Sequence, residues 1–260
     1  MEKLSVVIIT YNEAINIGRC IDSVKAIADE IIILDSFSTD KTVEIAKEKG
    51  AIVSQQKFAG YIEQKNAALG LAANPYVLCL DADEALDETL MHSISNVKSS
   101  YTHHAYTMNR CTNYCGQFIR HGSWYPDKKL RLFDKRTARW GGINPHDKVE
   151  TGANSIMHLR GDILHYSYAS IDEHILQNNK FSTISAASLY KMGKRTNVMK
   201  IVLNPFWAFI QSYFVRVGLL DGFYGFVIAI NIAHLTFLKH VKLYQLQGTR
   251  NKVQGTSHKI

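Results

Sequence analysis

Two carboxylates stand one residue apart at the end of an apolar run. Residues 76–80, Tyr-Val-Leu-Cys-Leu, lead directly into Asp81-Ala82-Asp83-Glu84. The run is typical of a buried strand, so its polar end should emerge at the carboxyl edge of a sheet. Asp81 and Asp83 could share a divalent cation and leave positions open for phosphate oxygens, which suits Mg²⁺ or Mn²⁺. The alternative is that Asp83 only caps a helix starting at Glu84.

Two other apolar runs also end in polar residues. Residues 4–9 lead into Thr10-Tyr11-Asn12-Glu13, and residues 30–34 lead into Asp35 and the polar segment after it. Helical patterns follow both runs. Asn12 could cap the first helix, whose free N–H groups would then favour an anion at the same sheet edge.

Strand and helix patterns alternate through the first ninety residues. The expected strands are 4–9, 30–34, 51–54 and 76–80, and the expected helices are 14–26, 40–50 and 58–73. This alternation predicts a parallel sheet whose strand ends meet at one ligand-binding edge. No G-x-G-x-x-G follows the first strand and no G-x-x-x-x-G-K-[ST] occurs, which argues against dinucleotide-binding and P-loop proteins.

The pattern changes after residue 100. Strands are expected at 103–110, 129–133 and 163–166, followed by an amphipathic helix over 171–193. We expect this half to extend the same sheet.

The C-terminal segment is apolar and aromatic. Its first part, 201–215, is short for a membrane span, and its second, 217–238, contains Asp221, Asn231 and His234. Basic residues follow. The pattern favours a helical hairpin lying in the plane of a membrane, and the alternative is a helix pair packed on the core or on a dimer partner.

Composition indicates a folded globular protein, with 46% hydrophobic and 20% charged residues among 260. The net charge of +7 permits an anionic partner: nucleic acid, a phospholipid surface or a phosphorylated substrate. Lysines are spread along the chain without a nucleic-acid-reading motif, so no nucleic-acid partner is expected. The four cysteines form no disulfide framework and the N-terminus is not a signal peptide, which indicates the reducing cytosol.

The three strand-end motifs resemble those of glycosyltransferase family 2, the inverting, nucleotide-sugar-dependent class with the GT-A fold. They are residues 5–13, 35–40 and 80–84, in the order and spacing of that family. Further segments resemble its subgroup of lipopolysaccharide core β-1,4-glucosyltransferases: 124–127, 130–133, 146–149, 164–166, 193–195 and 220–226.

The resemblance implies an α/β fold, a Rossmann-like mixed sheet of the GT-A type with a C-terminal helical, membrane-associated extension. Residues 1–195 would form the catalytic domain, divided into a nucleotide-sugar-binding half (1–100) and an acceptor-binding, metal-completing half (101–195). Residues 196–260 would form the apolar helices and basic tail.

For the metal, Mg²⁺ or Mn²⁺, the resemblance implies Asp83 as direct ligand and Asp81 on the ribose or a metal-bound water. His165 would complete the metal shell, or it is simply a hydrogen-bonded strand histidine.

For the UDP-sugar donor, Tyr11 would stack on the base, with Thr10, Asn12 and Glu13 lining the same pocket. Asp35 would accept from the uracil N3–H, or it only begins an Asx-turn. Lys65 would reach the diphosphate, or it is a solvated helix lysine.

For the acceptor, Asp147 is the expected catalytic base, where the subgroup's His-Glu pair places its carboxylate. Aspartate replaces glutamate here, which shortens the reach by one methylene; Glu150 is the alternative base, and Asp147 could instead be a surface turn residue. His146 would orient the base.

Three more residues are acceptor candidates. Arg131 would bind an acceptor phosphate or pair with an acid inside the fold. Trp124 and Tyr125 would form a sugar platform or belong to an aromatic core.

The expected function is transfer of a hexose, with glucose the first choice, to a lipopolysaccharide core or related glycolipid acceptor. We expect a cytoplasmic enzyme, peripheral on the inner membrane, with a homodimer possible. The alternatives are a family 2 transferase acting on a soluble or protein acceptor, and a non-catalytic member that binds nucleotide or membrane.

Overall fold

The computed structural model describes residues 2–143, 146–152 and 155–256, with side chains described except at 143, 146 and 249–256. Two compact units form. The sheet unit comprises Met1–Thr112 and Asp127–Ser167, and the helical unit comprises Asn113–Pro126 and Tyr168–Ile260. This division differs from the expected boundary at residue 195, because helix α5 (Ile171–Lys191) packs against α7 (Gly222–Thr256) in the helical unit.

One sheet dominates the described part of the sheet unit, with strand order β3-β2-β1-β4-β8-β6-β11-β5. Its strands are β1 (Leu4–Thr10), β2 (Glu30–Asp35), β3 (Ile52–Gln55), β4 (Tyr76–Asp81), β5 (Glu84–Leu86), β6 (Ala105–Tyr114), β8 (Asp127–Asp134) and β11 (Ile156–Tyr168). A separate antiparallel pair joins β9 (Ala138–Ile143) to β10 (His146–Thr151). In the helical unit, β7 (Gln117–Phe118) pairs with the end of β6.

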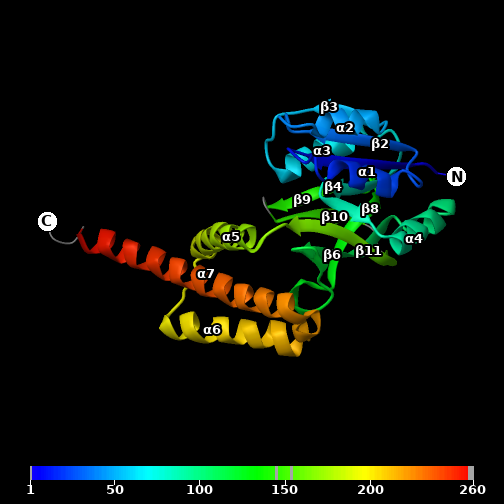
Figure 1. Ribbon diagram of the computed structural model, residues 1–260. Helices are drawn as coiled ribbons and strands as arrows, with labels where there is room; N and C mark the ends of the chain where they lie inside the picture. Colours follow the sequence, from blue (N-terminus) through cyan, green and yellow to red (C-terminus); the bar gives the residue numbers. More distant parts are fainter. Residues whose placement is uncertain (1, 144–145, 153–154, 257–260) are drawn as a thin grey trace. The chain divides into compact units, whose positions relative to one another are not determined.

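The first four strands are parallel, as the alternating pattern predicts (Figure 1). In register, Thr10 pairs with Asp35 and Ile9 with Asp81. The polar residues that follow β1, β2 and β4 therefore meet at one edge of the sheet. Strand β8 continues the sheet antiparallel to β4, so the second half extends the same sheet.

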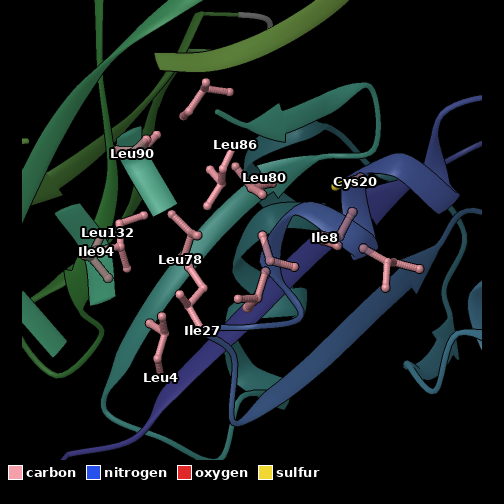
Figure 2. Packing of buried hydrophobic residues seen from close by; sticks show 14 of the residues in the cluster. Leu4, Ile8, Cys20, Ile27, Leu78, Leu80, Leu86, Leu90, Ile94 and Leu132 are labelled. Carbon is pink, nitrogen blue, oxygen red and sulfur yellow. The ribbon is translucent and has the colours of Figure 1, made fainter. Parts of the chain in front are cut away.

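Apolar side chains on both faces hold helices against this sheet. On one face, β1 and β4 pack against α1 (Ile17–Val24) and α4 (Glu88–Ser99), and Figure 2 shows Leu4, Ile8, Leu78 and Leu80 in that layer. Helix α2 (Thr42–Glu48) contributes Ala46 to the same layer. On the other face, α3 (Tyr61–Leu71) covers Val7, Val77 and Cys79. Each fully buried aliphatic side chain contributes about 1.5–3 kcal/mol.

One local expectation, the helix cap at Asn12, and one alternative, the helix cap at Asp83, are wrong. Asn12 does not cap the first helix, which begins at Ile17; Asn12 has φ +54° and its Oδ1 accepts from the Thr39 N–H at 2.8 Å. Asp83 does not begin a helix, because Glu84 enters strand β5 and Asp87 caps α4, accepting from the Leu90 N–H at 2.7 Å.

In the helical unit, α6 (Val198–Ile210) and α7 run side by side, joined by a π-helical turn (Gln211–Val215) and a 3₁₀ turn (Gly218–Asp221) (Figure 1). Asp221 is a buried polar residue within this apolar segment. Its carboxylate accepts from the backbone N–H groups of Arg120 (3.2 Å) and His121 (2.8 Å), so it ties the α6–α7 connection to the segment Asn113–Pro126.

Two stretches of the described chain are long and apolar enough to cross a membrane. They are Val198–Val215, with mean hydropathy 1.2, and Gly218–Gly248, with mean hydropathy 1.4. Only 6% of the first and 33% of the second are buried, whereas the core helix of a soluble protein is mostly buried.

Replacement of Gly161 by alanine should destabilise the protein by about 2–3 kcal/mol. Gly161 has φ +97°, and an added Cβ would lie 2.2 Å from the backbone nitrogen of Leu90 at the start of α4. Backbone strain and the steric clash both oppose the substitution. Thermal unfolding of Gly161→Ala checks this. Gly70→Ala is the matched control, in a helix with open space around it, and should be neutral or raise stability by up to about 1 kcal/mol. Equal midpoints for the two variants would contradict the steric argument.

Candidate functional site

A cavity of about 640 Å³, the edge cavity, opens where β1 and β4 end. Six residues expected from the sequence line it: Thr10, Tyr11, Glu13, Asp81, Asp83 and His165. The parallel register brings the first three to Asp81 and Asp83, and the antiparallel pairing of β11 with β5 brings His165 beside them.

Seven lining residues were not among the site residues expected from the sequence: Ile9, Ser36 and Ala82 beside the strand ends, and a second group of Lys57, Phe58, Tyr61 and Gln64. The second group lies in the loop after β3 and the first turns of α3. Phe58 and Tyr61 form an edge-to-face pair with ring centroids 5.1 Å apart, and both are about half exposed. Exposed aromatic residues next to exposed Tyr11 are the signal that could have indicated a surface for a planar base.

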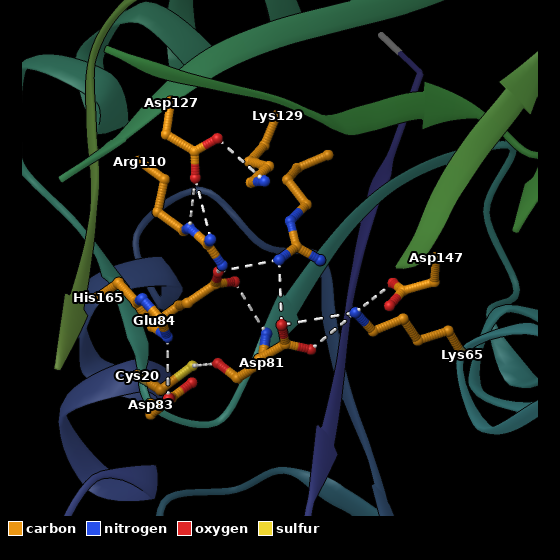
Figure 3. A network of polar contacts seen from close by, with 11 residues as sticks. Cys20, Lys65, Asp81, Asp83, Glu84, Arg110, Asp127, Lys129, Asp147 and His165 are labelled. Carbon is orange, nitrogen blue, oxygen red and sulfur yellow. Dashed lines mark hydrogen bonds and ion pairs between the residues drawn. The ribbon is translucent and has the colours of Figure 1, made fainter. Parts of the chain in front are cut away.

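Asp83 and His165 form the part of the edge cavity best suited to a cation. Asp83 Oδ2 lies 3.1 Å from His165 Nε2 (Figure 3). Among the described residues, no three His, Cys, Asp or Glu side chains are arranged to hold a metal ion. Mg²⁺ and Mn²⁺ often take only one or two protein carboxylates, with substrate phosphates and waters completing the shell, so this pair fits such an ion. His165 Nδ1 is buried and has no partner within the described chain, so no second hydrogen bond from these residues fixes the orientation of the ring.

Asp81 faces two cations. Lys65 Nζ lies 3.1 Å from Oδ1, and Arg131 Nη2 donates to Oδ2 at 3.0 Å. Burial by itself would raise the pKa of Asp81, but Arg131 and Lys65 outweigh it and hold that pKa well below its usual range. Asp81 therefore stays ionised at the wall of the cavity.

Glu84 anchors the same network. Its side chain is fully buried, accepts from Arg131 Nη2 at 2.9 Å, and accepts from the backbone N–H of Asp81 at 3.0 Å (Figure 3). Through Nη2, Arg131 thus pairs with acids inside the fold, which is the second of its two expected roles.

A second cavity of about 490 Å³, the basic cavity, shares Asp81 with the edge cavity. Asp147 lines it from β10, with Oδ2 at 2.8 Å from Lys65 Nζ. Lys65 is 6% exposed and lies 4.5 Å from the centroid of the Trp140 ring, so it is not the solvated helix lysine of the alternative.

The structure separates the two candidate bases. Side chains alternate along a strand, so Asp147 and Glu150 project from opposite faces of β10. The Glu150 carboxylate lies over Gly141 of β9, where an added Cβ would be 2.4 Å from Glu150 Cδ, and Glu150 lines neither cavity. The side chain of His146 lies outside the described residues.

The side chains of Asp35 and Asn12 accept hydrogen bonds from neighbouring segments of the chain. Asp35 is fully buried and accepts from the Ser38 N–H (2.9 Å) and from Gln55 Nε2 (2.8 Å), as the Asx-type alternative expects. Neither Asp35 nor Asn12 is among the residues that line the edge cavity; Ser36 is.

Trp124 and Tyr125 belong to the helical unit. Trp124 stacks on Tyr168 with ring centroids 5.5 Å apart and meets Tyr114 edge-to-face at 5.6 Å. Trp124 therefore takes part in the aromatic core of that unit, which is the alternative to a sugar platform.

Replacement of Arg131 by methionine should lower stability by about 3–5 kcal/mol, because Glu84 and Asp81 would lose the cation that compensates their burial. Urea unfolding at neutral pH measures the change. Lys49→Gln is the matched control: it breaks the surface ion pair with Asp22 and should cost less than about 1 kcal/mol. Similar losses in both variants would contradict a dominant role for the buried network.

Comparison with known proteins places the chain among glycosyltransferases. A family model described as "Glycosyl transferase family 2" matches residues 5–159. An uncharacterised glycosyltransferase of Rickettsia typhi is 35% identical over 99% of this chain and 92% of its own length. The lipopolysaccharide core biosynthesis glycosyltransferase LpsC of Rhizobium meliloti is 30% identical over 98% of both chains.

Solved structures with similarity to the chain include S. aureus TarS, at 15% identity and TM-score 0.47, covering 95% of this chain and 92% of that one. Glucosyl-3-phosphoglycerate synthase of Mycobacterium tuberculosis, in complex with Mn²⁺, UDP and glucosyl-3-phosphoglycerate, has 23% identity and TM-score 0.37. It covers 43% of this chain and 44% of that one.

Proposed function

Because this chain belongs to glycosyltransferase family 2, we propose that it is an inverting, metal-dependent hexosyltransferase. It transfers a hexose, with glucose the first choice, from a UDP-sugar to a lipopolysaccharide core or related glycolipid. The observation that carries this proposal is the edge cavity, where Asp83 Oδ2 and His165 Nε2 lie 3.1 Å apart and exposed Tyr11 lines the same cavity. The similarity to LpsC supports the choice of acceptor.

The fold expected from the resemblance is confirmed. The chain has the mixed α/β GT-A fold, with parallel β3-β2-β1-β4, antiparallel β8 beside β4, and C-terminal helices. Ligands of open α/β sheets bind at the carboxyl ends of the strands, which is where the edge cavity lies.

The donor occupies the edge cavity in this proposal. Tyr11 stacks on the base, and Lys57 at the cavity wall attracts the diphosphate. A bound Mg²⁺ or Mn²⁺ would be held by Asp83 and His165 and would neutralise the charge that develops on the leaving diphosphate. Asp81, already paired with Lys65 and Arg131, fixes the position of the loop that carries Asp83.

Asp147 serves as the base that accepts the proton of the acceptor hydroxyl. Lys65 donates to Oδ2 of Asp147, and Oδ1 has no partner among the described residues, so in this proposal Oδ1 is the oxygen that takes the proton. Lys65 also contacts Asp81, and therefore holds the base at a fixed distance from the donor side of the site. General-base catalysis of this kind contributes about 10²–10⁴ in rate.

We also propose that the helical unit attaches to the cytoplasmic face of the inner membrane. Six large apolar side chains of α6 are more than half exposed: Val198, Met199, Val202, Leu203, Phe206 and Trp207. In α7, the exposed residues Phe223, Phe226, Ile230 and Phe237 recur at helical spacing on one face. Buried Asp221 between the helices favours a hairpin in the plane of the membrane over two spans.

Calorimetric titration with UDP, with and without Mn²⁺, tests the donor site. We expect Mn²⁺-dependent binding that Asp83→Ala abolishes. Asp147→Asn should keep UDP binding and lose transfer by about a hundredfold or more, because only the base is removed. Asp22→Asn, an exposed carboxylate away from both cavities, is the control.

Full metal-dependent transfer by Asp83→Ala would show that the metal assignment is wrong. Absence of UDP binding with either metal would indicate another nucleotide donor or the non-catalytic alternative, and a panel of GDP, CMP and dTDP separates these two.

Flotation with vesicles of phosphatidylethanolamine and phosphatidylglycerol tests the membrane proposal. Phe206→Ser combined with Trp207→Ser should weaken partitioning by at least about tenfold, because two exposed aromatic side chains no longer bury apolar surface. Ile15→Ser combined with Ile52→Ser, which removes exposed apolar residues of the sheet unit, should leave it unchanged. If the wild-type protein does not bind vesicles and forms a stable dimer, the exposed face of α6 is instead a dimer interface.

A further inference from the structure

The basic cavity is lined by more basic residues than carboxylates, so some of its positive charge is left without an ion pair. Six basic side chains line it, against the two carboxylates Asp81 and Asp147: Lys65, Arg110, Lys128, Lys129, Arg131 and Lys148. Four of the six are paired. Lys65 and Arg131 contact Asp81, while Arg110 and Lys129 share Asp127 at 2.9 and 3.0 Å (Figure 3).

Lys128 and Lys148 differ from these four basic residues in their exposure and in their contacts. Both are exposed, on β8 and β10, and neither has an ion partner among the described residues. Both residues line the basic cavity, and neither ammonium group is paired with a described carboxylate, so binding of an anion in this cavity is favoured.

Arg131 supplies unused donors at the same cavity. Arg131 is 4% exposed, and its Nη2 donates hydrogen bonds to both Asp81 and Glu84. Its Nε and Nη1 are buried and have no hydrogen-bond partner among the residues that the structure describes. A buried donor left unpaired costs about 1–3 kcal/mol, and a guanidinium fork matches the oxygens of a phosphate.

We propose that the basic cavity binds the phosphate of a phosphorylated sugar acceptor, held by Lys128, Lys148 and Arg131, while a hydroxyl of the same sugar meets Asp147. This inference rests on the proposed transferase function and names the class of its acceptor. A volume of about 490 Å³ is within the range of cavities that enclose small ligands.

The donor diphosphate is a poorer occupant of this cavity. Asp81 forms part of the wall of both cavities, so a diphosphate extending from the edge cavity into the basic cavity would meet a carboxylate side chain on its way. Asp147, in contrast, is suited to a ligand that carries a hydroxyl as well as an anionic group.

Calorimetry on the full-length protein saturated with UDP and Mn²⁺ tests the proposal, with glucose 6-phosphate as the probe and glucose as its neutral counterpart. We expect glucose 6-phosphate to bind and glucose to bind at least about tenfold more weakly, because a charge-assisted hydrogen bond contributes about 1.5–3 kcal/mol. Lys128→Gln combined with Lys148→Gln should weaken the binding of glucose 6-phosphate by about tenfold or more and leave the binding of glucose unchanged.

The matched control is Lys41→Gln combined with Lys47→Gln. These lysines are exposed at helix α2 and line neither cavity, so the same change in net charge should leave binding of the probe unchanged. This control separates a local site from general electrostatic attraction.

Three outcomes would overturn the proposal: equal binding of glucose and glucose 6-phosphate, equal loss in the two double variants, or displacement of UDP by glucose 6-phosphate. The last would assign the cations to the donor diphosphate. UDP affinity is measured on the same samples, so failure of the donor site is distinguished from absence of the phosphate site.

Discussion

The buried contact of Arg131 with Asp81 and Glu84 is the interaction on which the rest of the site depends. Two carboxylates lie within reach of one guanidinium. Glu84 is fully buried and needs a cation to compensate its charge, whereas the side chain of Asp81 is 27% exposed. Glu84 accepts from the backbone N–H of Asp81, and this hydrogen bond closes the turn between β4 and β5. Asp83 projects from that segment toward His165.

Lys65 extends the network from one cavity to the other. Its ammonium group reaches Asp81 on the edge cavity and Asp147 on the basic cavity, and it lies against the face of Trp140. A single buried cation therefore sets the distance between the residues that we assign to the donor and to the acceptor. Such a cation reduces the repulsion between two carboxylates that would otherwise disfavour each other at close range.

In our proposal, specificity for the acceptor depends on the basic side chains that this network leaves without an ion pair. Carboxylates form ion pairs with Lys65, Arg110, Lys129 and Arg131. Lys128 and Lys148 have no ion partner within the described chain. A protein whose buried charges must be paired can thus keep a few unpaired cations at the surface for ligand recognition, because an exposed cation changes the free energy of unfolding little.

The sequence by itself determined the parallel half of the sheet and the convergence of Thr10, Tyr11, Asp81 and Asp83. Apolar runs of the length of a strand, separated by helical periodicity, allow few other arrangements, and their polar ends must then share an edge. The family also followed from the residues at those strand ends. All of these features depend on short-range pattern.

Only the tertiary structure decided the partners of the charged residues. Arg131 and Asp81 are fifty positions apart and Lys65 and Asp147 are eighty-two apart, so no local pattern could pair them. Strand register placed Asp147 in the basic cavity and Glu150 on the opposite face, and packing drew Trp124 into the aromatic core of the helical unit. Periodicity indicates which face of an element is buried, but the contact between two distant side chains depends on how the elements pack, which periodicity does not contain.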